Sequence, residues 1–260
     1  MAVRSEQSVL LNLVALLKLE RTGPDRFRGG AAGNPDGRLF GGHVAAQALA
    51  AAARTVDLDR TVHSLHAYFL APGDTTGELT YTVERLRDGR STSARRVSAS
   101  QRGTMLFTLS AAFATPRAGQ PEHQIEPPSA PDPEALPTLA ERMRRNVQVR
   151  SSARLPAWLS GPSAFDVRYV SRSATPSGYD QCVWVRADGK LPDDPALHAG
   201  LLTYVSDLSL LSAVLAARGE RWDPGRKRLT SLDHALWCHR ECRVDEWLLY
   251  AQQSPASAGG

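Results

Sequence analysis

A proline-dense segment divides this chain into two parts of similar length. Seven prolines fall between residues 116 and 137. Proline lacks a backbone N–H and clashes with a preceding helical turn, so this stretch can form neither a helix nor a central strand. We therefore expect an extended linker over residues 115–137, with one folded unit before it (1–114) and one after it (138–260).

The first unit is predicted to contain one helix followed by four antiparallel strands. Residues 44–56 are rich in alanine and contain no proline or glycine, which favours a helix of small side chains. Alternating apolar and polar residues, separated by short turns, then predict strands. These strands cover residues 63–70, 79–84, 91–101 and 105–113. Because the turns between them are short, neighbouring strands should pair antiparallel.

The second unit repeats part of this order. Leucine and valine at helical spacing predict a helix over residues 201–215. Strands are predicted at residues 165–170, 181–186, 231–239 and 246–251. In both units a strand that begins Ser-Leu and carries a histidine follows the helix, so we interpret the chain as an internal duplication of a helix-plus-sheet unit. The second copy has two predicted strands after its helix, where the first copy has four.

Composition and charge narrow the function classes. The formal net charge is +4, but the arginines are spread along the chain, whereas nucleic-acid binders usually concentrate positive charge on one face. Attraction of an anionic metabolite remains compatible with this charge. The three cysteines do not form a disulfide framework, and the apolar run over residues 10–17 is too short for a membrane span or a secretory signal. We expect a cytoplasmic protein that binds no nucleic acid and has no membrane span.

The common cofactor and metal motifs are missing. Gly41-Gly42 lacks the further residues of a phosphate-binding loop, and no Gly-x-Ser-x-Gly nucleophile motif occurs. The spacing of Cys238, His239 and Cys242 matches no usual zinc pattern, so strand residues are the better interpretation. We expect neither a metal nor a cofactor.

A few polar residues are candidates for chemistry. Asp207 lies in an otherwise apolar helix, so it is either on the outer face or buried and hydrogen-bonded for a purpose, and the residues alone leave both open. Ser231 opens a strand, where serine is most often a turn residue. His63, His66 and His234 are possible bases, although histidines in such places are more often structural.

Several long blocks of this sequence resemble the type II acyl-CoA thioesterases. The blocks are FGGHVAAQALAAA, VHSLHAYFLAPGD, LRDGRSTSARRVSASQRG, YVSDLSLL and SLDHALWCHRECRVDEWLLY. They occur in the family's order, and the resemblance runs from about residue 8 to about residue 258. The resemblance implies an α+β double hotdog fold, in which two tandem antiparallel sheets are each wrapped around a long helix.

The same resemblance implies the catalytic residues. The family uses an Asp on the second hotdog helix, a Thr or Ser at the start of the following strand, and a Gln near the C-terminus. The first two match Asp207 and Ser231. No residue here matches the glutamine, since Gln252 and Gln253 lie one strand too early. We therefore expect the second unit to lack the family's last two strands, with reduced activity as a consequence.

The expected reaction is hydrolysis of fatty acyl-CoA to a free fatty acid and CoA. Asp207 would accept a proton from water as a general base, and Ser231 would hold that water. Acyl-CoA is the expected partner, together with further copies of the chain in a homo-oligomer. Two alternatives stay open: a hotdog hydratase or dehydratase, for which His43 is the candidate histidine, and a non-catalytic acyl-CoA binding or assembly protein.

Overall fold

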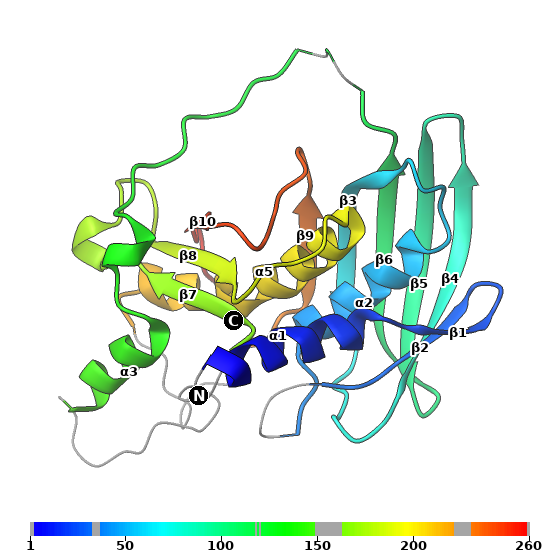
Figure 1. Cartoon of the computed structure of the whole chain (residues 1–260), viewed down its shortest axis with the longest axis horizontal. Coiled ribbons are helices and arrows are strands. Elements are labelled where there is room, and N and C mark those ends of the chain that lie inside the picture. The colour runs from blue at the N-terminus through cyan, green and yellow to red at the C-terminus, as the bar shows by residue number, and fades with distance from the viewer. Residues whose placement is uncertain are drawn as a thin grey trace.

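Two sheets with two packed helices between them make up the protein. The description rests on a computed structural model and covers residues 3–258, except 33–36, 118, 120, 149–162 and 221–229. Figure 1 shows a large twisted sheet on one side, a small sheet on the other, and helices α2 and α5 running between them. This arrangement is a double hotdog, as the sequence predicted.

The first unit contains the large sheet. Its elements are α1 (Val3–Leu17), β1 (Glu20–Gly23), β2 (Arg26–Gly29), α2 (Gly41–Ala53), β3 (Thr61–Phe69), β4 (Leu79–Asp88), β5 (Thr92–Gln101) and β6 (Thr104–Ala114). Strands β4, β5 and β6 pair antiparallel in chain order, in agreement with the prediction, whereas β3 pairs with β6 instead of β4, because residues 70–78 form a loop longer than a hairpin turn. Alternate residues on these strands face α2 and bury an apolar core that includes Leu65, Tyr81, Val97 and Leu109.

The second unit contains the small sheet. Its described elements are η1 (Pro133–Ala135), α3 (Leu139–Gln148), β7 (Phe165–Tyr169), η2 (Arg172–Ala174), β8 (Gln181–Ala187), α5 (Pro195–Ala217), β9 (Asp233–Trp237) and β10 (Leu248–Gln252). Helix α1 also packs into this part of the molecule, because Leu10, Leu13 and Leu17 belong to the core formed by β7, β8 and α5. The chain before the linker therefore supplies part of the second core.

Helix α2 begins at Gly41, three residues before the predicted start at residue 44. Glycine is a poor helix former, which is why the sequence argued against including this pair. The structure gives the reason for the glycines: a Cβ atom on Gly42 would lie 2.4 Å from the carbonyl oxygen of Tyr204 on α5. Two helix backbones can approach this closely only where side chains are absent. The alanines that follow extend the close packing along α2.

Helix α5 has clear signals at both ends. The Asp194 carboxylate accepts hydrogen bonds from the N–H groups of Ala196 and Leu197, and Pro195 occupies the first turn. The helix ends at Ala217 and is followed by Gly219, whose φ of 67° is left-handed; the N–H of Glu220 bonds back to the Leu215 carbonyl at 2.8 Å. By length and composition α5 could cross a membrane. In this protein it is a core helix, packed against α2 and β8.

The strand order leaves a gap in the second unit. The large sheet has the order β1-β2-β4-β5-β6-β3-β9, and the small sheet has the order β10-β8-β7. In the first unit β5 and β6 lie between β4 and β3, whereas the described residues place no strand between β10 and β9. Instead β9 pairs antiparallel with β3 and extends the first unit's sheet. Leu208 and Leu210 of α5 are 44% and 38% exposed.

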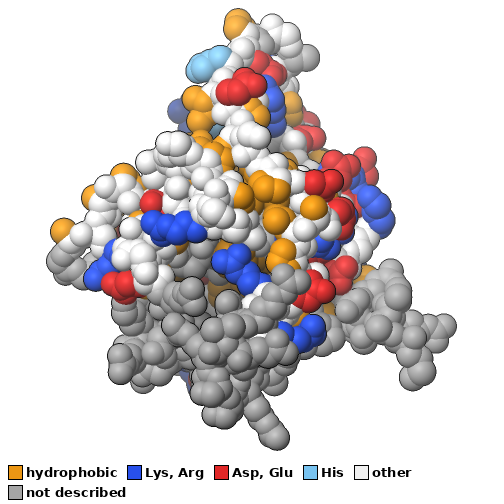
Figure 2. Space-filling model, turned by 90° about the vertical axis from the view of Figure 1, so that its left-hand side faces the viewer, with side chains coloured by type: hydrophobic (Ala, Val, Ile, Leu, Met, Phe, Trp, Pro, Cys, Tyr) orange, Lys and Arg blue, Asp and Glu red, His pale blue; other side chains and the backbone are white. Residues whose placement is uncertain are grey.

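The linker crosses the molecule as an extended chain. Figure 1 shows it leaving the end of β6 and arching over the top of the molecule to η1. The face drawn in Figure 2 carries acidic and basic side chains next to one another among its described residues. A surface of mixed charge does not have the one-sided positive potential typical of nucleic-acid binders.

Candidate active site

Asp207 and Ser231 lie in direct contact. The Ser231 hydroxyl donates a hydrogen bond to Oδ1 of Asp207 at 3.0 Å, although the two residues are far apart in the chain. Asp207 is near the middle of α5, and Ser231 lies two residues before β9. Both side chains are half-buried. Of the two positions that the residues alone left open for Asp207, the structure therefore shows the hydrogen-bonded one.

The first turn of α2 forms another side of this site. The backbone N–H of Gly42 donates to the Asp207 carboxylate. A Cβ atom on Gly41 would lie 2.8 Å from Oδ2 of Asp207 and 2.7 Å from the ring of Phe69. The positive end of the α2 dipole therefore faces the carboxylate. Sequence reasoning missed this role, although two glycines directly before an alanine-rich helix are a usable signal of close backbone approach.

A second pair of polar residues lies beside the first. Nε2 of His234 is 2.9 Å from Oγ of Ser206, the residue before Asp207, and both side chains are buried. The Tyr250 hydroxyl donates to the Ser206 carbonyl at 3.3 Å. Two consecutive residues of α5, Ser206 and Asp207, are thus bound by the segment Ser231–His234 at the start of β9. His234 was one of three histidines considered as bases, and the spacing in the sequence did not indicate its contact with Ser206.

Burial and hydrogen bonding set the protonation of the site. Burial raises the pKa of Asp207 above its ordinary value, while the Ser231 hydroxyl, the nearby His234 and the Gly42 N–H oppose that shift. Burial lowers the pKa of His234, against the attraction of Asp207 and Asp233. His234 is therefore neutral near pH 7. Burial, together with the charge of Asp207, raises the pKa of Tyr250 to about 12, so its hydroxyl keeps its proton.

The other histidine candidates lie elsewhere. His63 and His66 are exposed on β3, and the His66 ring packs edge-on against Trp237 with centroids 5.1 Å apart. His43 is buried in the first turn of α2, where its Nε2 lies 2.9 Å from the Gly30 carbonyl. Burial lowers the pKa of His43. The hydratase alternative depended on His43, which the structure ties to the backbone.

Gln252 forms hydrogen bonds with Ser209 and Gln181 rather than with Asp207 or Ser231. Its Nε2 donates to Oγ of Ser209 at 2.7 Å, and its Oε1 accepts from Gln181 at 2.5 Å. The hydrogen bonds that the structure gives Asp207 and Ser231 within the described residues come from each other and from Gly42. The candidate site therefore contains no glutamine contact in that part of the chain.

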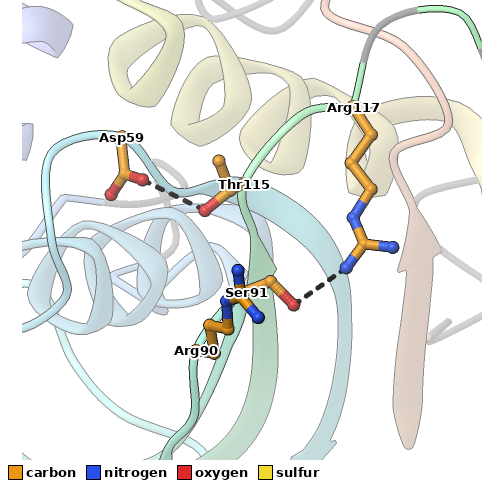
Figure 3. Close-up of a pocket in the computed structure, with 5 residues that line it drawn as sticks. All are labelled: Asp59, Arg90, Ser91, Thr115 and Arg117. Atoms are coloured by element: carbon orange, nitrogen blue, oxygen red, sulfur yellow. Dashed lines mark hydrogen bonds between the residues drawn. The ribbon is translucent and has the colours of Figure 1, made fainter.

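A separate surface pocket lies at the other end of β3. Its volume is about 500 Å³, and it is lined by Asp59, Arg90, Ser91, Thr115 and Arg117. Figure 3 shows Asp59 bonded to Thr115, and Arg117 bonded to Ser91. Strand β3 runs from this end to Phe69 beside Gly41, a span of about 26 Å at ~3.3 Å per residue. The pocket is therefore outside the Asp207 site.

Comparisons with known proteins show which family the chain resembles. The family model described as the acyl-CoA thioesterase N-terminal domain matches residues 31–115. The model described as acyl-CoA thioesterase matches residues 164–260, which include Asp207 and Ser231. A structure from Alicyclobacillus acidocaldarius, titled as a conserved protein with a hot dog fold, is 20% identical over 92% of this chain and 84% of that chain, with a TM-score of 0.68. It supports the fold alone.

More similar proteins extend the likeness over almost the whole chain. Human acyl-coenzyme A thioesterase 8 is 36% identical over 97% of this chain and 81% of its own length. Acyl-CoA thioesterase 2 of Haemophilus influenzae is 34% identical over 97% of this chain and 89% of its own length. The crystal structure of acyl-CoA thioesterase II TesB2 from Mycobacterium marinum is 40% identical, covers 95% of this chain and 88% of that chain, and has a TM-score of 0.78. This chain belongs to the type II acyl-CoA thioesterase family, and it is an acyl-CoA thioester hydrolase.

Proposed function

We propose that the enzyme hydrolyses fatty acyl-CoA by direct attack of a water molecule, with Asp207 as the general base and Ser231 as the residue that holds the water. The observation that carries the proposal is the 3.0 Å hydrogen bond from Ser231 to Asp207 at the start of α2. A thioester carbonyl is electrophilic and a thiolate leaves readily. An activated and well-placed water is therefore sufficient for the reaction.

The environment of Asp207 suits a general base. A raised pKa makes this carboxylate a stronger base than one on the surface. The attacking water gives one proton to Asp207 as its oxygen bonds to the thioester carbon. The C–S bond then breaks, and CoA leaves as the thiolate, which takes up a proton from the solvent. The fatty acid gives up the second proton of the water to the solvent and is released as the carboxylate, and Asp207 returns its own proton to the solvent.

The hydrogen-bond direction at Ser231 supports a holding role. The single hydroxyl proton of Ser231 is donated to Asp207, so the oxygen lone pairs are left to accept a hydrogen bond from water. A water bound to both Ser231 and Asp207 has one O–H directed at each of them. Its own lone pair is then available for the thioester carbon, and no acyl-serine needs to form.

The start of α2 supplies the electrostatic part of the proposal. Negative charge develops on the thioester oxygen during attack, and the positive end of a helix dipole stabilises it. Gly41 and Gly42 allow the backbone of this first turn to come within contact distance of Asp207. A substrate carbonyl next to Asp207 therefore lies next to the same helix end.

The experiment that tests this mechanism combines a free-thiol assay with intact-mass spectrometry. The purified enzyme should release CoA from a series of fatty acyl-CoA esters, and rapid quenching during turnover should leave the protein at its unmodified mass. Accumulation of a protein heavier by one acyl group, lost in Ser231→Ala, would show a covalent acyl-enzyme and refute direct attack by water. Binding of acyl-CoA without any release of CoA would refute the reaction itself.

A further inference from the structure

The segment Ser231–His234, which includes the first two residues of β9, is attached to two consecutive residues of α5. Ser231 donates to the side chain of Asp207 at 3.0 Å, and His234 contacts the side chain of Ser206 at 2.9 Å. The backbone between Ser231 and His234 is also bound to β3, since the N–H of Phe69 donates to the Leu232 carbonyl at 2.9 Å. The position of Ser231 relative to Asp207 therefore depends on a small set of bonds.

The hydrogen bonds of Ser206 determine the direction of its contact with His234. The Ser206 hydroxyl donates its one proton to the Thr203 carbonyl at 3.0 Å, one turn earlier on α5. It can therefore only accept from His234, whose Nε2 must carry the hydrogen. His234 is 7% exposed and Ser206 is 6% exposed, so water does not readily replace this bond. The imidazole is thus a neutral, buried donor with a fixed tautomer.

We propose that His234 is a positioning residue, which holds Ser231 in register with Asp207 through its hydrogen bond to Ser206. The inference rests on the proposed roles of Asp207 and Ser231 and extends them to a residue that touches neither the water nor the substrate. Loss of the His234 bond removes one of the two side-chain hydrogen bonds that join the segment Ser231–His234 to α5 and leaves its pairing with β3 in place. Ser231 can then move relative to the carboxylate, and small misplacements at a reacting centre are costly in rate.

The chemistry of the bond allows a matched pair of substitutions. The amide nitrogen of glutamine reaches about as far from the backbone as Nε2 of histidine, whereas the amide nitrogen of asparagine corresponds to Nδ1. His234→Gln should therefore keep the donor to Ser206, and His234→Asn should lose it. Ser206→Ala removes the acceptor with the smallest possible change in volume and serves as the second route to the same loss.

The expected results are a change in kcat with little change in KM. His234→Asn and Ser206→Ala should each lower kcat about five- to tenfold, the rate equivalent of one neutral hydrogen bond. His234→Gln should stay within about twofold of the parent, and KM for acyl-CoA should change less than about twofold in all three variants. In a Ser231→Ala background, His234→Asn should cause no further loss, because His234 acts through Ser231.

Several outcomes would overturn the inference. Parental kcat in both His234→Asn and Ser206→Ala would show that the bond has no positioning role, even where their unfolding temperatures fall. An equal loss in His234→Gln and His234→Asn would show that the imidazole itself is needed. A multiplicative loss in the double variant with Ser231→Ala would show action independent of Ser231. The assignment of Asp207 is tested separately: if Asp207→Asn is fully active, the proposed function fails before His234 is considered.

Discussion

A substitution at Gly41 tests whether the close approach of α2 to the Asp207 carboxylate is needed for turnover. In Gly41→Ala the new Cβ would lie 2.8 Å from Oδ2 of Asp207, while ordinary contact begins at 3.4 Å, so the oxygen must move by about 0.6 Å. The ring of Phe69, at 2.7 Å, must also turn. Both are ends of side chains, so the fold can adapt. Since a misplacement of about 1 Å costs roughly 10²-fold in rate, we expect kcat to fall about tenfold.

Two further glycine substitutions, one in α2 and one in α5, separate the expected loss of kcat from a loss of stability. In Gly42→Ala the contact is with the backbone oxygen of Tyr204 at 2.4 Å, so α2 and α5 must move apart. Such overpacking costs about 1–3 kcal/mol, and each 1 kcal/mol lowers Tm by about 2–4 °C in a chain near this size. Gly200 also lies in a helix, and among the described residues a Cβ atom there would meet a side-chain carbon of Leu17 at 3.7 Å, which is an ordinary contact. We therefore expect Gly200→Ala to raise the free energy of unfolding by about 0.5–1 kcal/mol and to leave turnover unchanged.

The assay measures CoA release and thermal unfolding on the same preparations. Gly41→Ala should lose turnover while its Tm stays within about 4 °C of the parent, because helix propensity offsets the contact with Phe69. The reasoning is refuted if Gly41→Ala keeps parental kcat. It is also refuted if Gly41→Ala loses as much stability as Gly42→Ala, since the loss of rate would then follow from a general disturbance of the helix pair.

Two further predictions concern Ser231 and the pH dependence of Asp207. Ser231→Ala should lower kcat less than removal of the base, and Ser231→Thr should be close to the parent in the same thiol assay, because either hydroxyl can hold the water. Because burial raises the pKa of Asp207, kcat/KM should rise with pH through that raised pKa and then level off. The hydrogen bond from Ser231 lowers the pKa of Asp207. In Ser231→Ala the rise in kcat/KM should therefore occur at higher pH than in the parent.

The first unit could be predicted well because its elements have strong local signals. Strands β4, β5 and β6 alternate clearly and are separated by short turns, so their order and antiparallel pairing followed from the residues, whereas the pairing of β3 with β6 did not. The hairpin of β1 and β2 was missed, because its charged and mostly exposed residues show no apolar alternation. Helix α1 was missed as well: the apolar run over residues 10–17 was considered only as a possible signal or span, and not as packing against the second unit.

Contacts between distant segments were harder to foresee. The strand at β9 was expected from its sequence, but a sequence pattern does not say which edge a strand joins, and β9 pairs with β3 of the other unit. For Asp207 the residues left a surface and a buried position equally open, and the family resemblance favoured the buried one. The contact between His234 and Ser206 could not be predicted from the spacing of these residues in the sequence, because it depends on how α5 and β9 are packed.

The base itself remains the most direct test. Asp207→Asn keeps the size and much of the hydrogen bonding of the side chain but cannot accept the proton of water. The raised pKa of Asp207 means that folding disfavours its charged form. The protonated Asp207 carboxyl therefore stabilises the fold at pH values below the pKa it has in the unfolded chain. This stabilisation is lost as pH rises through the pKa of Asp207 in the folded protein. At pH 7 the neutral amide should therefore leave Tm equal to or above that of the parent.

The decisive measurement is kcat for fatty acyl-CoA hydrolysis by Asp207→Asn beside the parent at pH 7, with Tm recorded for both proteins. Loss of a general base predicts a fall of about 10²–10⁴-fold in kcat with no fall in Tm. Turnover within a few-fold of the parent, in a variant that is equally folded, would contradict the account.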